Sequence, residues 1–205
     1  MQNKEQSTQE RILEAAKAEF LEKGFQTASL RTIVKAAGVT TGALYGYYDS
    51  KEALFDALVE ECYEHFLSAY RNALDDFGNL PIEQQPERMS TVSQACLEKI
   101  LLYMFEHREA FHLLLLCSEG TRYSSMRDAL VQLEINATHR YYRVLEKLGT
   151  PAPQIDPRLE HILVTGLMNA YFEMIIHDMP LTDAQQYLQV LHSFYSAGWL
   201  KIMGQ

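Results

Sequence analysis

Apolar residues recur at intervals of three and four along almost the whole chain, and no stretch alternates for long between apolar and polar positions. This spacing places apolar side chains on one face of an α-helix, whereas a β-strand needs alternation. The sequence therefore predicts an all-α fold. The expected helices run from Ser7 to Gly24, from Ser29 to Gly38, from Thr40 onward, from Ser50 to about Phe77, and over about 86–107, 109–118, 124–148, 157–178 and 183–203.

Several of these helix ends carry local signals. Ser7 and Glu10 have the spacing of a capping box. Gly24 and Gly38 are placed as C-terminal caps, where glycine adopts the left-handed conformation without steric cost. Pro157 stands at the first position of a late helix, which is where helices tolerate proline. These signals fix the helix boundaries more firmly than periodicity alone.

Residues 30–48 have the pattern of a helix-turn-helix, in which two short helices are joined by a turn that contains Gly38. In the second helix, Leu44 and Tyr48 are four residues apart and are expected in the core. The outer face is then left with Thr41, Gly42, Ala43, Gly46 and Tyr47.

The two glycines on this outer face weaken the helix, each by about 1 kcal/mol relative to alanine, but they let the backbone approach DNA closely. Tyr45 and Tyr47 can donate their hydroxyl groups to phosphates. Lys51 opens the next helix, where its charge and the free backbone amides both favour a phosphate.

The distribution of charge agrees with a DNA-binding N-terminal segment. The whole chain has a net charge of −9, which is unusual for a nucleic-acid binder. Residues 1–55 are neutral overall, however, and residues 23–51 have a net charge of +3, from Lys23, Arg31, Lys35 and Lys51 against Asp49. The acidic excess lies in residues 56–205, so a modest basic window precedes an acidic remainder.

Residues 11–55 contain a dense set of short segments: Ile12-Leu13-x-Ala15-Ala16, Gly24-Phe25, Leu30-Arg31-x-Ile33, Ala37-Gly38-Val39, Gly42-x-Leu44-Tyr45-x-Tyr47-Tyr48 and Lys51-Glu52-x-Leu54. In these segments the chain resembles the DNA-binding domain of the TetR family of transcriptional regulators. The resemblance implies two parts: a three-helix, helix-turn-helix DNA-binding domain over 1–50, and a helical ligand-binding and dimerisation domain over 51–205. It also implies a repressor that a small ligand releases from an inverted-repeat operator.

The resemblance assigns roles to individual residues. It implies base-edge contacts from Thr41, Gly42, Ala43 and Tyr47, and phosphate contacts from Ser29, Arg31, Thr40, Tyr45, Tyr47 and Lys51. Many relatives have a larger side chain at Gly46, and many have His and Phe in place of Tyr47 and Tyr48. The operator sequence therefore does not carry over from a relative.

The last two helices are apolar on nearly all sides, which predicts that part of their surface meets another chain. Gly166 and Gly198 would allow the helices to cross closely. The resemblance also implies a homodimer formed by these two helices as a four-helix bundle. The expected interface residues are Leu163, Gly166, Leu167, Leu191, Phe194 and Gly198.

Aromatic, thiol, methionine and histidine residues share faces of the middle helices, and mostly apolar walls with a few polar groups are typical of small-molecule sites. An ordinary core has the same composition. The expected ligand is mainly apolar, and the candidate residues are Tyr63, Phe66, Cys96, Tyr103, Met104, His107, Phe111, His139, Tyr142, Met168, Asn169 and Phe172.

Other functions receive weaker support from the sequence. Glu109 and His112 have the Glu-x-x-His spacing of ferritin-like metal bundles, but no second such pair follows. A ligand-responsive activator and a helical adaptor for proteins also stay open. We expect no catalytic residues, cofactor or metal. Cys62, Cys96 and Cys117 do not have the spacing of a disulfide framework. Because neither a signal peptide nor a transmembrane segment is visible, we expect a cytoplasmic protein without a membrane partner.

Overall fold

The computed structural model describes residues 6–204, and in this range it contains helices and no strand. The all-α prediction is confirmed. The chain divides into two compact units. The first comprises the described part of Met1–Glu64 together with His107–Ser124, and the second comprises His65–Glu106 and the described part of Ser125–Gln205. The sequence-based boundary at residue 50 stays a prediction.

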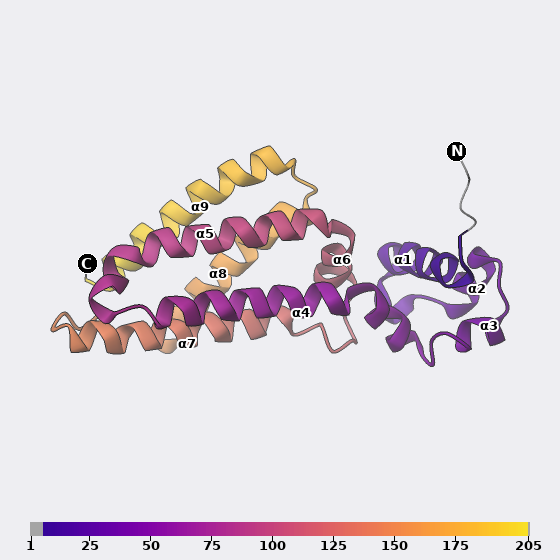
Figure 1. Cartoon of the computed structure of the whole chain (residues 1–205), viewed down its shortest axis with the longest axis horizontal. Helices are drawn as coiled ribbons and strands as arrows, with labels where there is room; N and C mark the ends of the chain where they lie inside the picture. The colour runs from indigo at the N-terminus through magenta and orange to yellow at the C-terminus, as the bar shows by residue number, and fades with distance from the viewer. Residues whose placement is uncertain (1–5, 205) are drawn as a thin grey trace. The chain divides into compact units, whose positions relative to one another are not determined.

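The first unit contains three N-terminal helices, the start of a fourth, and a short segment from the middle of the chain (Figure 1). Its core is aromatic: the ring of Phe20 lies 5.2 Å from that of Phe55, and Phe55 lies 6.0 Å from Tyr123. The elements are α1 (Thr8–Thr27), α2 (Leu30–Ala37), α3 (Thr41–Tyr45), the first part of α4 (Lys51–Gly78), α6 (Arg108–His112) and a π-helical turn η2 (Leu113–Cys117).

Most of the helix-end signals are confirmed. The capping box at Ser7 and Glu10 is present, and Gly38 ends α2 in the left-handed conformation with φ 65°. Gly24 has a positive φ of 72° and a non-helical backbone, so it interrupts the first helix as expected, and a short second stretch beyond this kink completes α1 to Thr27. The Ser29 side chain makes no capping bond; instead its N–H donates to the buried Glu19 carboxylate at 3.0 Å.

The second unit is a bundle of long helices (Figure 1). In it α7 packs against α8, and α9 packs against both α5 and α8. Its elements are the second part of α4, a 3-10 turn η1 (Ile82–Gln84), α5 (Gln85–Glu106), α7 (Met126–Lys147), α8 (Pro157–Ile176) and α9 (Leu181–Ile202). No helix in the described range has the length and apolar content needed to cross a membrane.

Candidate nucleic-acid interface and effector cavity

The turn between α2 and α3 is fixed by backbone geometry. Gly38 has a φ of 65°, which residues with a Cβ seldom adopt, and its N–H donates to the carbonyl of Lys35 at 3.3 Å. The Thr40 hydroxyl then accepts from the N–H of Ala43 at 3.1 Å and caps α3. These contacts set the direction in which α3 leaves the turn.

In α3 and the residues that follow it, two side chains are buried and most of the others are exposed. Leu44 is completely buried and Tyr48 is 7% exposed, as the sequence predicts, and Gln9 donates to the Tyr48 hydroxyl at 3.2 Å. Ala43 is half-buried. The exposed set consists of Thr40, Thr41, Gly42, Tyr45, Gly46 and Tyr47. Two large aromatic side chains, Tyr45 and Tyr47, are thus 48% and 51% exposed on this surface.

Basic side chains border this surface. Arg31 and Lys35 are exposed one turn apart on α2, and no ion pair to either is found within the described residues. Ser29 is half-buried just before the same helix. The exposed tyrosines and these two cations therefore come from consecutive elements of one helix-turn-helix.

Lys51 has a structural role that sequence reasoning missed. Its ammonium group donates to the carbonyls of Phe25, Gln26 and Ala28 at 2.7, 3.1 and 3.3 Å, and it lies 4.6 Å from the centre of the Phe25 ring. The last carbonyls of a helix have no partner within that helix, and a cation there stabilises them. Lys51 therefore fastens the start of α4 to the end of α1, and its predicted phosphate contact stays a prediction.

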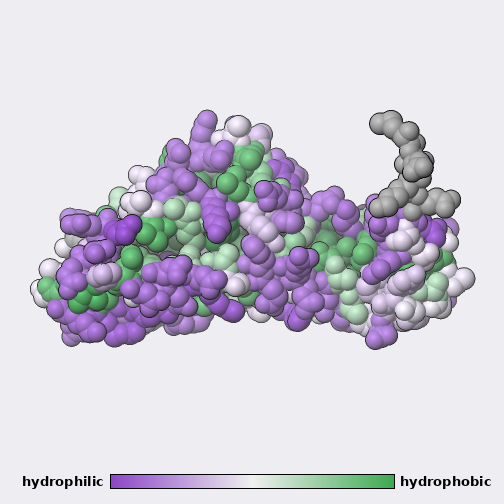
Figure 2. Space-filling model, in the orientation of Figure 1, coloured by the Kyte–Doolittle hydropathy of each residue, from purple (hydrophilic) through white to green (hydrophobic). Residues whose placement is uncertain are grey.

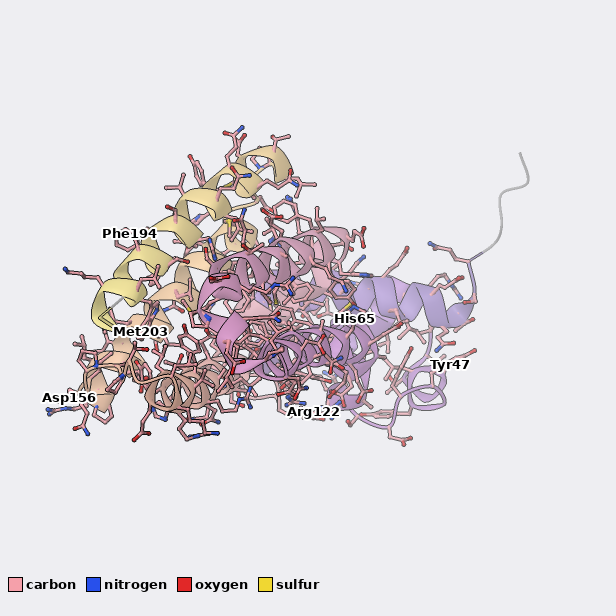
Figure 3. The ribbon with its side chains drawn as sticks, turned by 60° about the vertical axis from the view of Figure 1, so that its left-hand side comes forward. Tyr47, His65, Arg122, Asp156, Phe194 and Met203 are labelled. Carbon is pink, nitrogen blue, oxygen red and sulfur yellow. The ribbon has the colours of Figure 1, made fainter. Side chains whose placement is uncertain are left out.

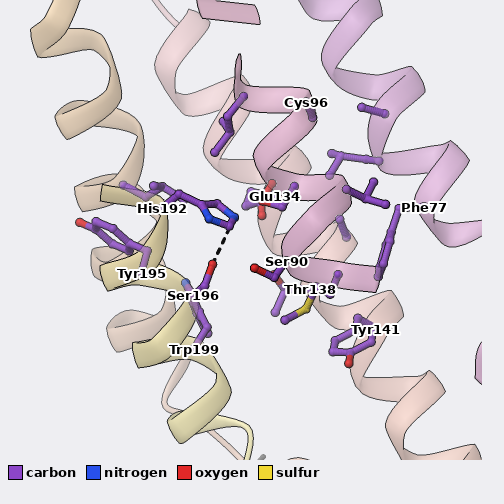
Figure 4. Close-up of a pocket in the computed structure, with 18 of the residues that line it drawn as sticks. Phe77, Ser90, Cys96, Glu134, Thr138, Tyr141, His192, Tyr195, Ser196 and Trp199 are labelled. Carbon is purple, nitrogen blue, oxygen red and sulfur yellow. Dashed lines mark hydrogen bonds between the residues drawn. The ribbon is translucent and has the colours of Figure 1, made fainter. Parts of the chain in front are cut away.

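The second unit contains a cavity of about 150 Å³ (Figure 4). Side chains of α4, α5, α7 and α9 line it, together with Leu167 of α8. The walls are mostly apolar and include the aromatic rings of Phe77, Tyr141 and Trp199. This combination of apolar walls and a few polar groups is what small-molecule sites have.

The polar groups of the cavity gather on one side. The Tyr70 hydroxyl donates to the Glu134 carboxylate at 2.5 Å, and Ser196 Oγ lies 3.2 Å from Nε2 of His192. Figure 4 shows His192 and Glu134 pointing toward one another. Burial raises the pKa of Glu134, although the Tyr70 bond opposes this shift, and burial lowers the pKa of His192. Burial also raises the pKa of the Cys96 thiol to about 11.

The predicted ligand residues lie in several places. Cys96 lines the cavity. Tyr63, His107 and Phe111 belong to the first unit. In the second unit Phe66, Met104, Met168 and Phe172 are buried in the core, and the Tyr103 ring stacks on His65 at 4.2 Å. His139 bonds the buried Glu160 at 2.8 Å beside the half-buried Tyr142, and Asn169 accepts from Arg127 at 3.5 Å. Their role in binding stays a prediction.

Sequence reasoning missed Tyr70, Glu134, His192 and Trp199, although helical spacing could have found them. Glu134 follows the buried Leu130 by four residues and precedes Tyr141 by seven. A position with apolar neighbours at these intervals lies on the buried face of a helix. A carboxyl group among such apolar neighbours is a stronger sign of a binding site than another buried aromatic ring.

The outer faces of α8 and α9 keep apolar residues in solvent. Val190 is 70% and Phe194 is 72% exposed on α9, and Ile162 is 63% exposed on α8. Phe194 projects from its helix in Figure 3, and green apolar residues interrupt the polar surface along α9 in Figure 2. Leu163, Leu167 and Leu191 are half-buried.

The two predicted interface glycines differ in their surroundings. A Cβ added at Gly166 would lie 2.9 Å from the hydroxyl of Tyr195, which belongs to α9 of the same chain. A Cβ at Gly198 would meet nothing within 4 Å. Gly166 thus lets Tyr195 of the same chain approach α8 closely, and Gly198 lies on an open surface.

The ferritin-like alternative finds no support in the arrangement of side chains. Glu109 pairs with Lys17 at 2.5 Å in the first unit. Within the described residues, no three His, Cys, Asp or Glu side chains come together as a metal site would require. The Glu109–His112 spacing is therefore not part of such a cluster.

Residues 12–58 match the family model described as bacterial regulatory proteins, tetR family. The regulator UidR of Escherichia coli K12 is 39% identical over 75 residues, which are 37% of this chain and 38% of UidR. The repressor KstR2 of Mycobacterium tuberculosis H37Rv is 34% identical over 73 residues, 36% of each chain. The match thus spans less than half the length of these relatives.

Solved structures extend the likeness to the whole fold. SmeT, the repressor of the multidrug efflux pump SmeDEF of Stenotrophomonas maltophilia, superposes with a TM-score of 0.57 over 94% of this chain and 90% of SmeT, at 20% identity. Its complex with triclosan gives the same TM-score at 22% identity, over 94% of this chain and 91% of that one. Residues 12–58 therefore match the tetR family of bacterial regulatory proteins, and the chain shares its overall fold with SmeT.

Proposed function

We propose that the protein is a dimeric, sequence-specific repressor of transcription that binds an inverted-repeat operator and leaves it when a small, mainly apolar effector binds. The observation that carries this proposal is the surface of α3, where two tyrosines and two glycines are exposed while Leu44 and the following Tyr48 are buried. A recognition helix needs this division between an anchored inner face and a free outer face. The proposed target places the protein in the cytoplasm.

The repressor assignment is supported by relatives. KstR2 is a repressor, and SmeT, which has the same fold, is a repressor whose structure was solved with a small molecule bound. In the proposed complex, Thr41, Gly42, Ala43 and Tyr47 face base edges, and phosphates are bound by Ser29, Arg31, Thr40, Tyr45, Tyr47 and Lys51.

The proposed dimer uses the exposed faces of α8 and α9. Tyr187, Val190 and Phe194 follow one another at intervals of three and four, so they form one stripe along α9. Leaving such a stripe in water is unfavourable, and pairing with a second copy would bury it. Two recognition helices in a symmetric dimer would then match an inverted repeat.

The proposed release acts through α4. This helix begins at Lys51, which holds the end of α1, and its later residues Tyr70 and Phe77 line the cavity of the second unit. A ligand that shifts α4 would therefore act on the element to which the DNA-binding helices are fastened. Such a shift would alter the spacing of the two recognition helices in the dimer.

The test is selection of genomic fragments by the purified protein, followed by gel-shift titration of the enriched site. Tyr47→Phe removes one hydroxyl and should weaken binding about fivefold, the effect of losing about 1 kcal/mol. Thr91→Val is the matched control, because it removes an exposed hydroxyl from α5, outside the recognition helix and the proposed dimer faces. Thr41→Ala should alter the preferred bases, and affinity should fall steeply with salt. Failure to enrich any fragment would contradict the proposal.

A further inference from the structure

The charge inside the cavity of the second unit identifies a chemical class of ligand. Glu134 is its one carboxyl group, and no Lys or Arg stands among the described residues that line it. We propose that this cavity binds a small organic amine, whose ammonium group pairs with Glu134 and whose hydrocarbon part lies against the aromatic wall. This inference rests on the proposed function, because it names the class of effector.

The carboxylate lacks a cationic partner in the described structure. Its hydrogen bond from Tyr70 comes from a neutral hydroxyl, which stabilises one oxygen without cancelling the charge. Burial raises the pKa of Glu134, which is the response of a carboxyl group whose negative charge is poorly compensated. A ligand carboxylate would be repelled by the negative charge of Glu134, whereas an ammonium group would supply the missing positive charge.

The walls of the cavity also favour a cation. Phe77, Tyr141 and Trp199 line it, and the faces of aromatic rings attract ammonium groups. The volume of about 150 Å³ is that of a cavity that accommodates a benzene ring. A single ring or a short branched chain with one amino group therefore fits in both size and charge.

His192 completes the polar side without competing for Glu134. It points toward the carboxyl group in Figure 4 and is 6% exposed, and burial lowers its pKa, which disfavours the charged form of the ring. A protonated primary amine has three N–H donors. One can bond Glu134, and the hydroxyls of Ser90 and Ser196, which also line the cavity, are acceptors for the others.

The experiment uses the fluorescence of Trp199, the single tryptophan of the chain, as a reporter inside the cavity. The full-length protein is titrated with benzylamine, benzyl alcohol and benzoate, which have similar shapes and different charges. Benzylamine should bind about tenfold more tightly than benzyl alcohol, since a charge-assisted hydrogen bond replaces a neutral one. Benzoate should not bind. Equal affinities for the amine and the alcohol, or tighter binding of benzoate, would overturn the proposal.

Two variants locate the site. Glu134→Gln keeps the shape and removes the charge, so the preference for benzylamine over benzyl alcohol should disappear. Glu146→Gln, an exposed position on the same helix, is the control and should retain the preference. Ala137→Leu fills the cavity and should abolish the Trp199 response to every probe. Ala137→Leu keeps the test decisive if Glu134→Gln does not fold. A response that survives Ala137→Leu would place the amine elsewhere and refute the assignment.

A gel shift with the selected operator separates this inference from the proposed function. Release of the operator by benzylamine, with loss of that release in Glu134→Gln, supports both. Benzylamine binding without any release supports the amine site and contradicts its role as the effector site. Operator binding without any amine preference contradicts the amine site and leaves the repressor assignment standing.

Discussion

At the scale of single residues, Lys51 joins two helices through three main-chain carbonyls. Lys51→Ala should lower the free energy of unfolding by about 1–2 kcal/mol, because it removes hydrogen bonds from a charged donor to the end of α1. Lys35→Ala, which removes an exposed lysine from α2, should change it by less than about 0.5 kcal/mol. Urea unfolding followed by circular dichroism measures both. If the two variants unfold alike, the carbonyl contacts contribute nothing.

Gly42 allows a second test at the same scale, one that separates folding from DNA binding. A Cβ at Gly42 would meet only the Thr40 hydroxyl, at 3.9 Å, so Gly42→Ala fits the free protein. The substitution should stabilise the fold by roughly 0.5–1 kcal/mol, because alanine favours helix. It should also weaken operator binding in a gel shift, because a methyl group then stands between backbone and DNA. The control is Gly78→Ala at the open end of α4. Unchanged affinity would show that close approach at Gly42 is not required.

At the scale of elements, the exposed stripe of α9 predicts which substitutions separate dimerisation from folding. Phe194→Glu should give a folded monomer, because Phe194 is 72% exposed within one chain. Leu188→Glu should unfold the second unit, because Leu188 is completely buried and an unpaired buried charge is costly. Gln189→Glu, an exposed position away from the stripe, is the control and should stay dimeric. Sedimentation velocity and circular dichroism distinguish these results, and a dimeric Phe194→Glu variant would rule this interface out.

The elements also show which features of the fold can be predicted from the sequence. Helix starts at Ser7 and Thr40 were predictable because their caps depend on residues three positions away. The π-helical turn Leu113–Cys117 was read as ordinary helix, since apolar periodicity does not distinguish the two. The Lys51 contacts join residues more than twenty positions apart, and the cavity is lined by residues of five helices. Such features depend on tertiary packing, which one sequence does not specify.

At the scale of the whole molecule, the proposed function couples the operator and the effector through one protein. A coupling free energy of about 1–3 kcal/mol corresponds to a change in affinity of roughly 5–150-fold. The coupling is reciprocal, so saturating operator DNA should weaken effector binding by the same factor with which effector weakens DNA binding. Titrations that follow Trp199 fluorescence, with operator and with a scrambled duplex of equal length, measure this factor. Equal effector affinity with both duplexes would contradict the coupling.

The separation of buried and exposed positions in and just after α3 has a consequence for how such proteins diversify. Leu44 and Tyr48 anchor the helix, whereas Thr41, Gly42, Tyr45 and Tyr47 are exposed and contribute little to its packing. Substitutions at the exposed positions of a recognition helix can therefore alter the preferred DNA sequence at little cost in stability. After gene duplication, two copies of such a regulator can acquire different target genes through a few point mutations while both stay folded.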